Sequence, residues 1–157
     1  MKQYEDHVQM EFVLNGERIT TRFDVDETLL AVVRDRIGLK GPKGGCLNGD
    51  CGACTMLLDG QPVKACLMLA LDAEGKEVTT IEGLKDTPIQ QAFIEKLGFQ
   101  CGYCTAGFLM NIHAMLTQHP EADEAVFKNW LSSNLCRCTG YEGIEEAIKL
   151  AQKNMTE

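Results

Sequence analysis

The residues of this 157-residue chain most able to do chemistry are its eight cysteines, which fall into two groups of four. In the first group Cys46, Cys51 and Cys54 follow the pattern C-x4-C-x2-C, and Cys66 comes after eleven further residues. Three thiolates on one short loop, with a fourth from a later segment, can enclose a two-iron [2Fe–2S] cluster. We therefore expect these four cysteines to bind one such cluster.

Glycines surround the first group at Gly44, Gly45, Gly49 and Gly52. Without Cβ atoms they permit sharp turns and let backbone N–H groups approach the sulfurs, which stabilises negative charge there. The same cysteine spacing occurs in plant-type ferredoxins. The alternative is a structural zinc site, but zinc sites usually pair two C-x2-C knuckles and do not require three ligands on one glycine-rich loop.

The second group consists of Cys101 and Cys104, spaced C-x2-C, with Cys136 and Cys138, spaced C-x-C. Each pair precedes a predicted helix, where the helix dipole and free N–H groups favour thiolate over thiol. Taken alone, this group is ambiguous, because a [2Fe–2S] cluster, a zinc ion and a C-x2-C redox pair all fit it.

Composition narrows the possible functions. The formal net charge is −8, and there is no basic patch or stripe of the kind that nucleic-acid binding requires. We find no apolar run long enough to span a membrane and no secretory signal at the start, so we expect no membrane insertion and a cytoplasmic location. In that compartment thiols stay reduced, and clustered cysteines indicate metal ligands.

The first half of the chain is predicted to form strands around one helix. Alternating apolar residues and turn signals predict strands at residues 8–14, 18–25, 55–58, 61–66 and 77–81. Asn15-Gly16 and Asp59-Gly60 are hairpin turns. Asp26 is the expected N-cap of a helix that ends at Gly38, and the glycine-rich segment 41–52 is a loop.

The second half is predicted to be helical. Thr87, Pro88 and Gln90 open the first helix, and a Thr139–Glu142 capping box opens the fourth. The apolar positions expected to face inward follow helical spacing: Phe93, Ile94 and Leu97; Phe108, Leu109, Ile112, Met115 and Leu116; Val126, Phe127, Trp130 and Leu131; Ile144, Ala147, Ile148 and Ala151. The prediction is therefore an α+β chain with one domain at 1–82 and a second at 83–157.

Taken together, the motifs resemble those of the small iron–sulfur subunit of the molybdenum hydroxylases, the family of xanthine dehydrogenase and carbon monoxide dehydrogenase. The resemblance covers nearly the whole chain and rests on three motifs in order: Gly45-Cys46-x4-Cys51-Gly-Ala-Cys54-Thr55, Gln100-Cys101-Gly102-Tyr103-Cys104-Thr105, and Asn134-Leu135-Cys136-Arg137-Cys138-Thr139-Gly140-Tyr141.

This resemblance implies a β-grasp ferredoxin-like domain followed by a four-helix domain that carries a second [2Fe–2S] cluster on Cys101, Cys104, Cys136 and Cys138. It also implies two partners, a large subunit with molybdopterin, expected as the cytosine dinucleotide, and a medium subunit with FAD. Electrons would pass from the pterin to the helical cluster, then to the ferredoxin-like cluster, then to FAD. Gln100 and Cys138 would contact the pterin, and the chain would have no substrate site of its own.

Two departures from the family pattern stand out. Ala106 replaces the usual proline after the Cys104-Thr105 pair, and Pro42 and Gly44 alter the loop before Cys46. We expect Ala106 to have little effect on ligation, whereas the changed loop would shift the potential of the first cluster. The competing hypotheses are a scaffold protein with two structural zinc ions and a free-standing ferredoxin with a helical appendage.

Overall fold

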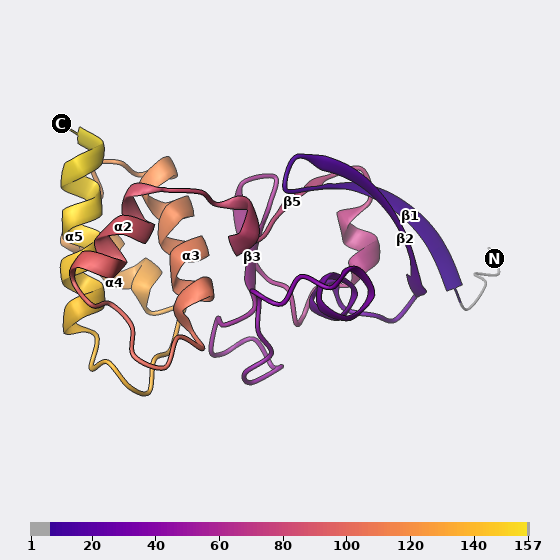
Figure 1. Ribbon diagram of the computed structural model, residues 1–157, viewed down its shortest axis with the longest axis horizontal. Coiled ribbons are helices and arrows are strands. Elements are labelled where there is room, and N and C mark those ends of the chain that lie inside the picture. Colours follow the sequence, from indigo (N-terminus) through magenta and orange to yellow (C-terminus); the bar gives the residue numbers. More distant parts are fainter. Residues whose placement is uncertain (1–6, 157) are drawn as a thin grey trace.

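The computed structural model describes residues 7–156 as a mixed β-sheet with its covering helix at one end and a group of helices at the other (Figure 1). The chain forms the sheet end first and then crosses to the helical end. It is an α+β structure, as predicted.

The sheet has five strands in the order β2-β1-β5-β3-β4. Strand β1 pairs antiparallel with β2 and parallel with β5, while β3 pairs antiparallel with both β5 and β4. The strand bounds are β1 His7–Leu14, β2 Glu17–Asp24, β3 Thr55–Leu58, β4 Gln61–Lys64 and β5 Glu77–Thr79. Strands β4 and β5 are each two residues shorter than the predicted segments 61–66 and 77–81.

Both predicted hairpin turns are confirmed. Asn15 and Gly16 have φ values of 53° and 83°, and Asp59 and Gly60 have values of 48° and 77°. Two successive residues with positive φ are the signature of the tight turn that matches the twist of the flanking strands. The second turn matters for the site, because it folds β4 back along β3 and returns the chain toward Cys54.

One helix covers the sheet, formed by α1 (Leu29–Ala31) and the π-helical segment η1 (Val32–Ile37). The prediction that Asp26 is its N-cap was wrong. The cap is Thr28, whose side-chain oxygen accepts a hydrogen bond from Ala31 N at 3.2 Å. Gly38 ends the helix in the left-handed conformation at φ 97°, as predicted.

The helix and the sheet bury one apolar core between them. Its largest fully buried side chains come from the sheet (Phe12, Phe23, Met56 and Val78) and from the helix (Leu29, Val32 and Val33). Cys54 and Cys66 are part of this core. Two short 3₁₀ turns, η2 (Ala70–Ala73) and η3 (Ile81–Gly83), complete the sheet end.

Four helices make a second apolar core: α2 (Pro88–Glu95), α3 (Thr105–Gln118), α4 (Glu124–Leu131) and α5 (Glu142–Thr156). The predicted opening of α2 is confirmed, since the Gln90 side chain accepts a hydrogen bond from Thr87 N at 2.9 Å. The predicted inward faces of α3 and α5 are buried throughout.

Two details of the helical half differ from the sequence prediction. Ile94 and Leu97 are 67% and 74% exposed, because α2 turns the face of Ile89, Ala92 and Phe93 inward. Thr139 does not cap the last helix, which starts only at Glu142.

The two ends are joined by a small apolar cluster of Leu57 from β3 with Met110 and Ala114 from α3. Gly107 makes the approach possible, since a Cβ there would lie 2.1 Å from the carbonyl oxygen of Gly52. Helix α3 therefore rests directly on the loop that carries the first cysteine group. Among the described residues, no helix is long and apolar enough to cross a membrane.

The orientation of α2 can be tested with two substitutions of one residue type. Ile89 is 1% exposed and Ile94 is 67% exposed. We expect Ile89→Ala to lower the free energy of unfolding by about 2–5 kcal/mol, since it leaves a cavity. Ile94→Ala should change it by less than about 0.5 kcal/mol. Urea denaturation of both variants measures the difference, and equal losses would show that the helix is wrongly oriented.

Candidate metal centres

Loop and hairpin geometry bring the first cysteine group together. Cys46 and Cys51 lie on the loop between η1 and β3, Cys54 directly precedes β3, and Cys66 follows β4. Because Thr55 pairs with Lys64 across the β3–β4 hairpin, the two strands return Cys66 to the level of Cys54. All eight cysteines are free thiols, and none forms a disulfide.

The thiols of the first group meet in two pairs. Cys51 affects the pKa of Cys46, and Cys66 affects the pKa of Cys54, so Cys46 is the neighbour of Cys51 and Cys54 is the neighbour of Cys66. The first pair is partly exposed, whereas Cys54 and Cys66 are 2% and 8% exposed. One side of the group thus faces the sheet core and the other faces the surface.

Three of the four glycines predicted to shape this loop are required, for two different reasons. Gly49 and Gly52 have φ values of 88° and 70°, which side-chain-bearing residues rarely adopt. Gly45 is required for space instead, since a Cβ there would lie 2.8 Å from Cys51 Sγ, whereas a Cβ on Gly44 would meet only the end of the exposed Leu47 side chain, at 2.8 Å.

Backbone N–H groups of the loop point at sulfur. Cys51 N donates to Cys46 Sγ at 3.3 Å, and this bond, with further ones from the backbone of Asn48 and Asp50, lowers the pKa of Cys46 to about 7. Burial has the opposite effect on Cys54 and raises the pKa of its thiol to about 11. The loop therefore stabilises negative charge on its exposed side, which suits a thiolate-ligated centre.

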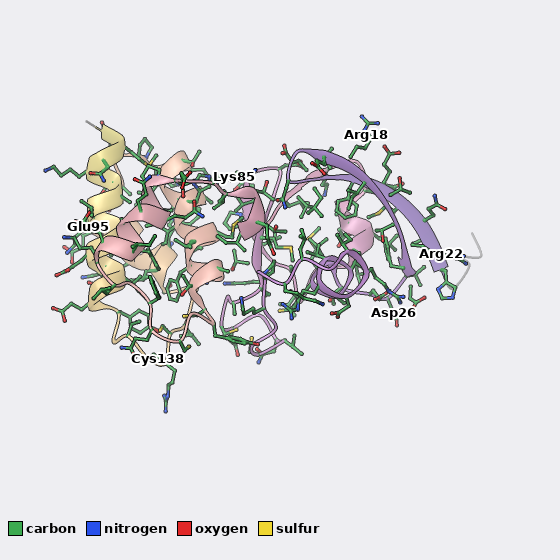
Figure 2. All side chains as sticks on the ribbon, viewed as in Figure 1. Arg18, Arg22, Asp26, Lys85, Glu95 and Cys138 are labelled. Atoms are coloured by element: carbon green, nitrogen blue, oxygen red, sulfur yellow. The ribbon has the colours of Figure 1, made fainter. Side chains whose placement is uncertain are left out.

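The second group lies in the helical half. Cys104 is the N-cap of α3, and Cys136 and Cys138 lie on the loop between α4 and α5. Cys101 and Cys138 are exposed, with their sulfurs 3.8 Å apart, and Cys138 lies at the edge of the helical half (Figure 2). Cys104 and Cys136 are neighbours in a deeper part of the group, and burial raises the pKa of Cys104 to about 12.

Thr139 turns toward the second group, which explains why it does not cap the following helix. Its hydroxyl donates to Cys136 Sγ at 3.2 Å and accepts from Tyr141 N at 3.2 Å, and its own N–H donates to Cys136 Sγ at 3.4 Å. Burial raises the pKa of Cys136, but hydrogen bonds from Thr139 together with those from the Cys138 backbone and Cys104 outweigh it, and the net pKa is lowered. The Thr139 hydroxyl is therefore directed at Cys136 Sγ and not at the N-terminus of α5.

The paired arrangement fits a two-iron centre. A tetrahedral metal with sulfur bonds of about 2.3 Å separates two of its thiolates by about 3.8 Å, the distance between Cys101 and Cys138. Each group contains four free thiols, the number that the two irons of a [2Fe–2S] cluster require. Within residues 7–156, no three or more histidine, cysteine or acidic side chains converge as ligands of one ion.

Direct contacts join the two cysteine groups. Leu135 N, next to Cys136, donates to the carbonyl oxygen of Cys51 at 3.0 Å. The hydroxyl of Tyr103, which lies between Cys101 and Cys104, donates to the carbonyl oxygen of Gly44 at 2.9 Å. The ligand-bearing backbones are therefore only one hydrogen bond apart.

Gln100, predicted to contact a pterin, is exposed and directly precedes Cys101. It therefore lies on the solvent-accessible side of the second group, where Cys101 and Cys138 are also exposed. Sequence reasoning missed Lys64, whose half-buried ammonium group donates to the carbonyl oxygen of Ser133. The desolvation that comes with burial lowers its pKa. Nothing in its spacing from Cys66 signals that contact.

Burial and hydrogen bonds fix the backbone around the two departures from the family pattern. Pro42 is buried, and the guanidinium of Arg34 donates to its carbonyl oxygen and to that of Lys40. Glu82 accepts a hydrogen bond from Gly41 N at 2.7 Å. Ala106 occupies the first turn of α3 and is 8% exposed, so a regular helix forms there without proline.

Comparison with known families agrees with this arrangement. Residues 41–97 match the model of a 2Fe-2S iron-sulfur cluster binding domain, and residues 80–149 match that of a [2Fe-2S] binding domain. The two matches contain all eight cysteines between them.

Whole-chain relatives are subunits of dehydrogenases and hydroxylases. The chain is 44% identical to the nicotine 6-hydroxylase small subunit of Paenarthrobacter nicotinovorans, over 91% of this chain and 88% of that one. It is 43% identical to caffeine dehydrogenase subunit gamma of Pseudomonas sp. (strain CBB1), over 87% and 86% of the two chains.

A solved structure extends the likeness to the fold. Quinoline 2-oxidoreductase from Pseudomonas putida 86 contains a chain that superposes with a TM-score of 0.91 at 35% identity, covering 97% of this chain and 98% of that one. The cysteine motifs, the paired thiols and these relatives agree, and the chain belongs to the family of small iron–sulfur subunits of the molybdenum hydroxylases.

Proposed function

We propose that this chain carries electrons between two partner subunits through two [2Fe–2S] clusters. The first would be held by Cys46, Cys51, Cys54 and Cys66, and the second by Cys101, Cys104, Cys136 and Cys138. When bound, each cluster stores and releases one electron at a time. The observation that carries the proposal is that two sets of paired thiols are joined by the hydrogen bond from Leu135 N to the Cys51 carbonyl.

The unequal exposure of the thiols supports a direction for the relay. Cys101 and Cys138 open to solvent beside Gln100, which offers a point where a pterin held by a large subunit could approach. Tyr103 and Leu135 then lead from the second group to the first. Cys46 and the exposed Leu47 mark the surface where electrons would leave toward FAD in a medium subunit.

The separate apolar cores of the two ends support the division into two domains, 1–82 and 83–157. The sheet with its covering helix would be the β-grasp ferredoxin-like domain, and α2 to α5 the four-helix domain. On this proposal the substrate is converted in the large subunit at a molybdopterin, as the cytosine dinucleotide. This chain supplies ligation, insulation and the route between cofactors, and it would act in the cytoplasm.

Serine substitutions test the assignment of ligands. Cys138→Ser should remove or convert the second cluster and leave the first, and Cys51→Ser should do the opposite, since the two belong to different groups of thiols. Electron paramagnetic resonance of the dithionite-reduced chain, with iron counted in parallel, separates the two signals. Loss of both signals from either change would contradict two independently ligated clusters.

A second test addresses the pterin contact. Gln100→Ala should keep both clusters, because Gln100 is exposed and binds no metal. It should slow substrate-dependent reduction of the clusters in the reconstituted complex, where the side chain would hydrogen-bond to the pterin. The exposed Gln91→Ala, on α2, is the matched control. Equal reduction rates for the two variants would count against the contact.

The isolated chain should show no substrate turnover. It carries cluster ligands but no residues that we assign to a substrate site. Purified chain with both clusters, incubated with a purine or an aldehyde and an artificial electron acceptor, should leave the acceptor oxidised. Hydroxylation by the chain alone would overturn its role as an electron carrier.

A further inference from the structure

The carbonyl oxygen of Gly52 receives an unusual number of hydrogen bonds. Thr55 donates to it twice, from its N–H at 3.1 Å and from its hydroxyl at 2.7 Å. Asn134 donates a third bond from Nδ2 at 3.0 Å. A carbonyl oxygen has two lone pairs, so its capacity as an acceptor is saturated. Its position is therefore fixed from two directions.

Asn134 reaches this oxygen from the other half of the chain. It is 1% exposed, and its own side-chain oxygen accepts a hydrogen bond from the hydroxyl of Ser133 at 3.0 Å. A Cβ on Gly52 would lie 2.3 Å from Asn134 Nδ2, so only glycine leaves the amide room to bind. Leu135 donates to the carbonyl of Cys51, so Asn134 and Leu135 bind the carbonyls of the successive residues Gly52 and Cys51. We call these two hydrogen bonds the clasp.

The clasp lies between the two thiol pairs of the first group. Cys51 belongs to the pair with Cys46, and Cys54 belongs to the pair with Cys66. Gly52 is one of the two residues that link Cys51 to Cys54. Any movement of the Gly52 peptide therefore changes how the two pairs stand relative to each other, and how Cys51 N points at Cys46 Sγ.

A buried asparagine can have a purely local role, and the chain contains one for comparison. Asn111 is 3% exposed and donates from Nδ2 to the carbonyl oxygen of Trp130 at 2.8 Å. Both partners of that bond lie in the helical half. Asn134 has the same chemistry and the same burial, but its acceptor belongs to the loop of a cluster held by the sheet half.

We propose that Asn134 is a positioning residue for the first cluster, through which the helical half sets the properties of a centre that it does not ligate. The inference rests on the proposed function, since it requires a cluster on Cys46, Cys51, Cys54 and Cys66. Hydrogen bonding at the ligand sulfurs tunes the potential of such clusters. Releasing the clasp therefore shifts the reduction potential of the first cluster and leaves the second unchanged.

The test compares Asn134→Asp with Asn111→Asp in the full chain, purified without oxygen. Both changes keep the side-chain shape and remove the Nδ2 donor. Redox titration followed by electron paramagnetic resonance measures the midpoint potential and line shape of each cluster. We expect Asn134→Asp to shift the first cluster's potential and broaden its signal, and Asn111→Asp to change neither cluster even where it lowers thermal stability.

A second variant keeps the proposal testable if Asn134→Asp fails to fold. Thr55→Val removes the hydroxyl that donates to the same Gly52 carbonyl without altering Asn134, and it should change the same signal. An unchanged first signal in Asn134→Asp, with both clusters present, would overturn this inference alone, as would an equal shift in Asn111→Asp. Absence of iron from the first group in the unsubstituted chain would instead overturn the proposed function, and the inference with it.

Discussion

The fold depends on one requirement, which is to hold thiol sulfurs next to one another while backbone N–H groups point at them. Sulfurs that carry negative charge repel one another, so a paired arrangement needs donors and rigid supports close by. In the first group the support is the β3–β4 hairpin, which fixes Cys54 and Cys66 inside the sheet core. In the second group the support is Thr139, whose hydroxyl donates a hydrogen bond to Cys136 Sγ and does not cap the following helix, although the sequence predicted that it would.

The sheet half and the helical half meet at the loop that carries the first cysteine group. Gly107 of α3 lies against the carbonyl of Gly52, and the backbone of Leu135 and the side chains of Asn134 and Tyr103 bind carbonyls of the first loop. A purely structural joint would use any convenient surface of the sheet. Here the apolar cluster of Leu57, Met110 and Ala114 is accompanied by hydrogen bonds from Tyr103, Asn134 and Leu135, which lie beside cysteines, as the proposed electron route would require.

The sequence predicted the cysteine groups, the strands, the hairpin turns and the helical half, because these follow from local spacing and period. It did not predict which face of α2 is buried: Ile94 fits the helical period, yet packing against α5 selects Ile89, Ala92 and Phe93. The pairing of thiols and the clasp by Asn134 also lay beyond it. The partners in that clasp are 82 residues apart, and only the folded chain brings them together.

Metal content tests the central claim most directly. Iron, acid-labile sulfide and zinc are counted per chain on protein purified without oxygen. Two clusters predict about four irons and four sulfides with no stoichiometric zinc. About two irons with one zinc would contradict the relay, because the second group would then be structural. Intact protein without iron would contradict both centres.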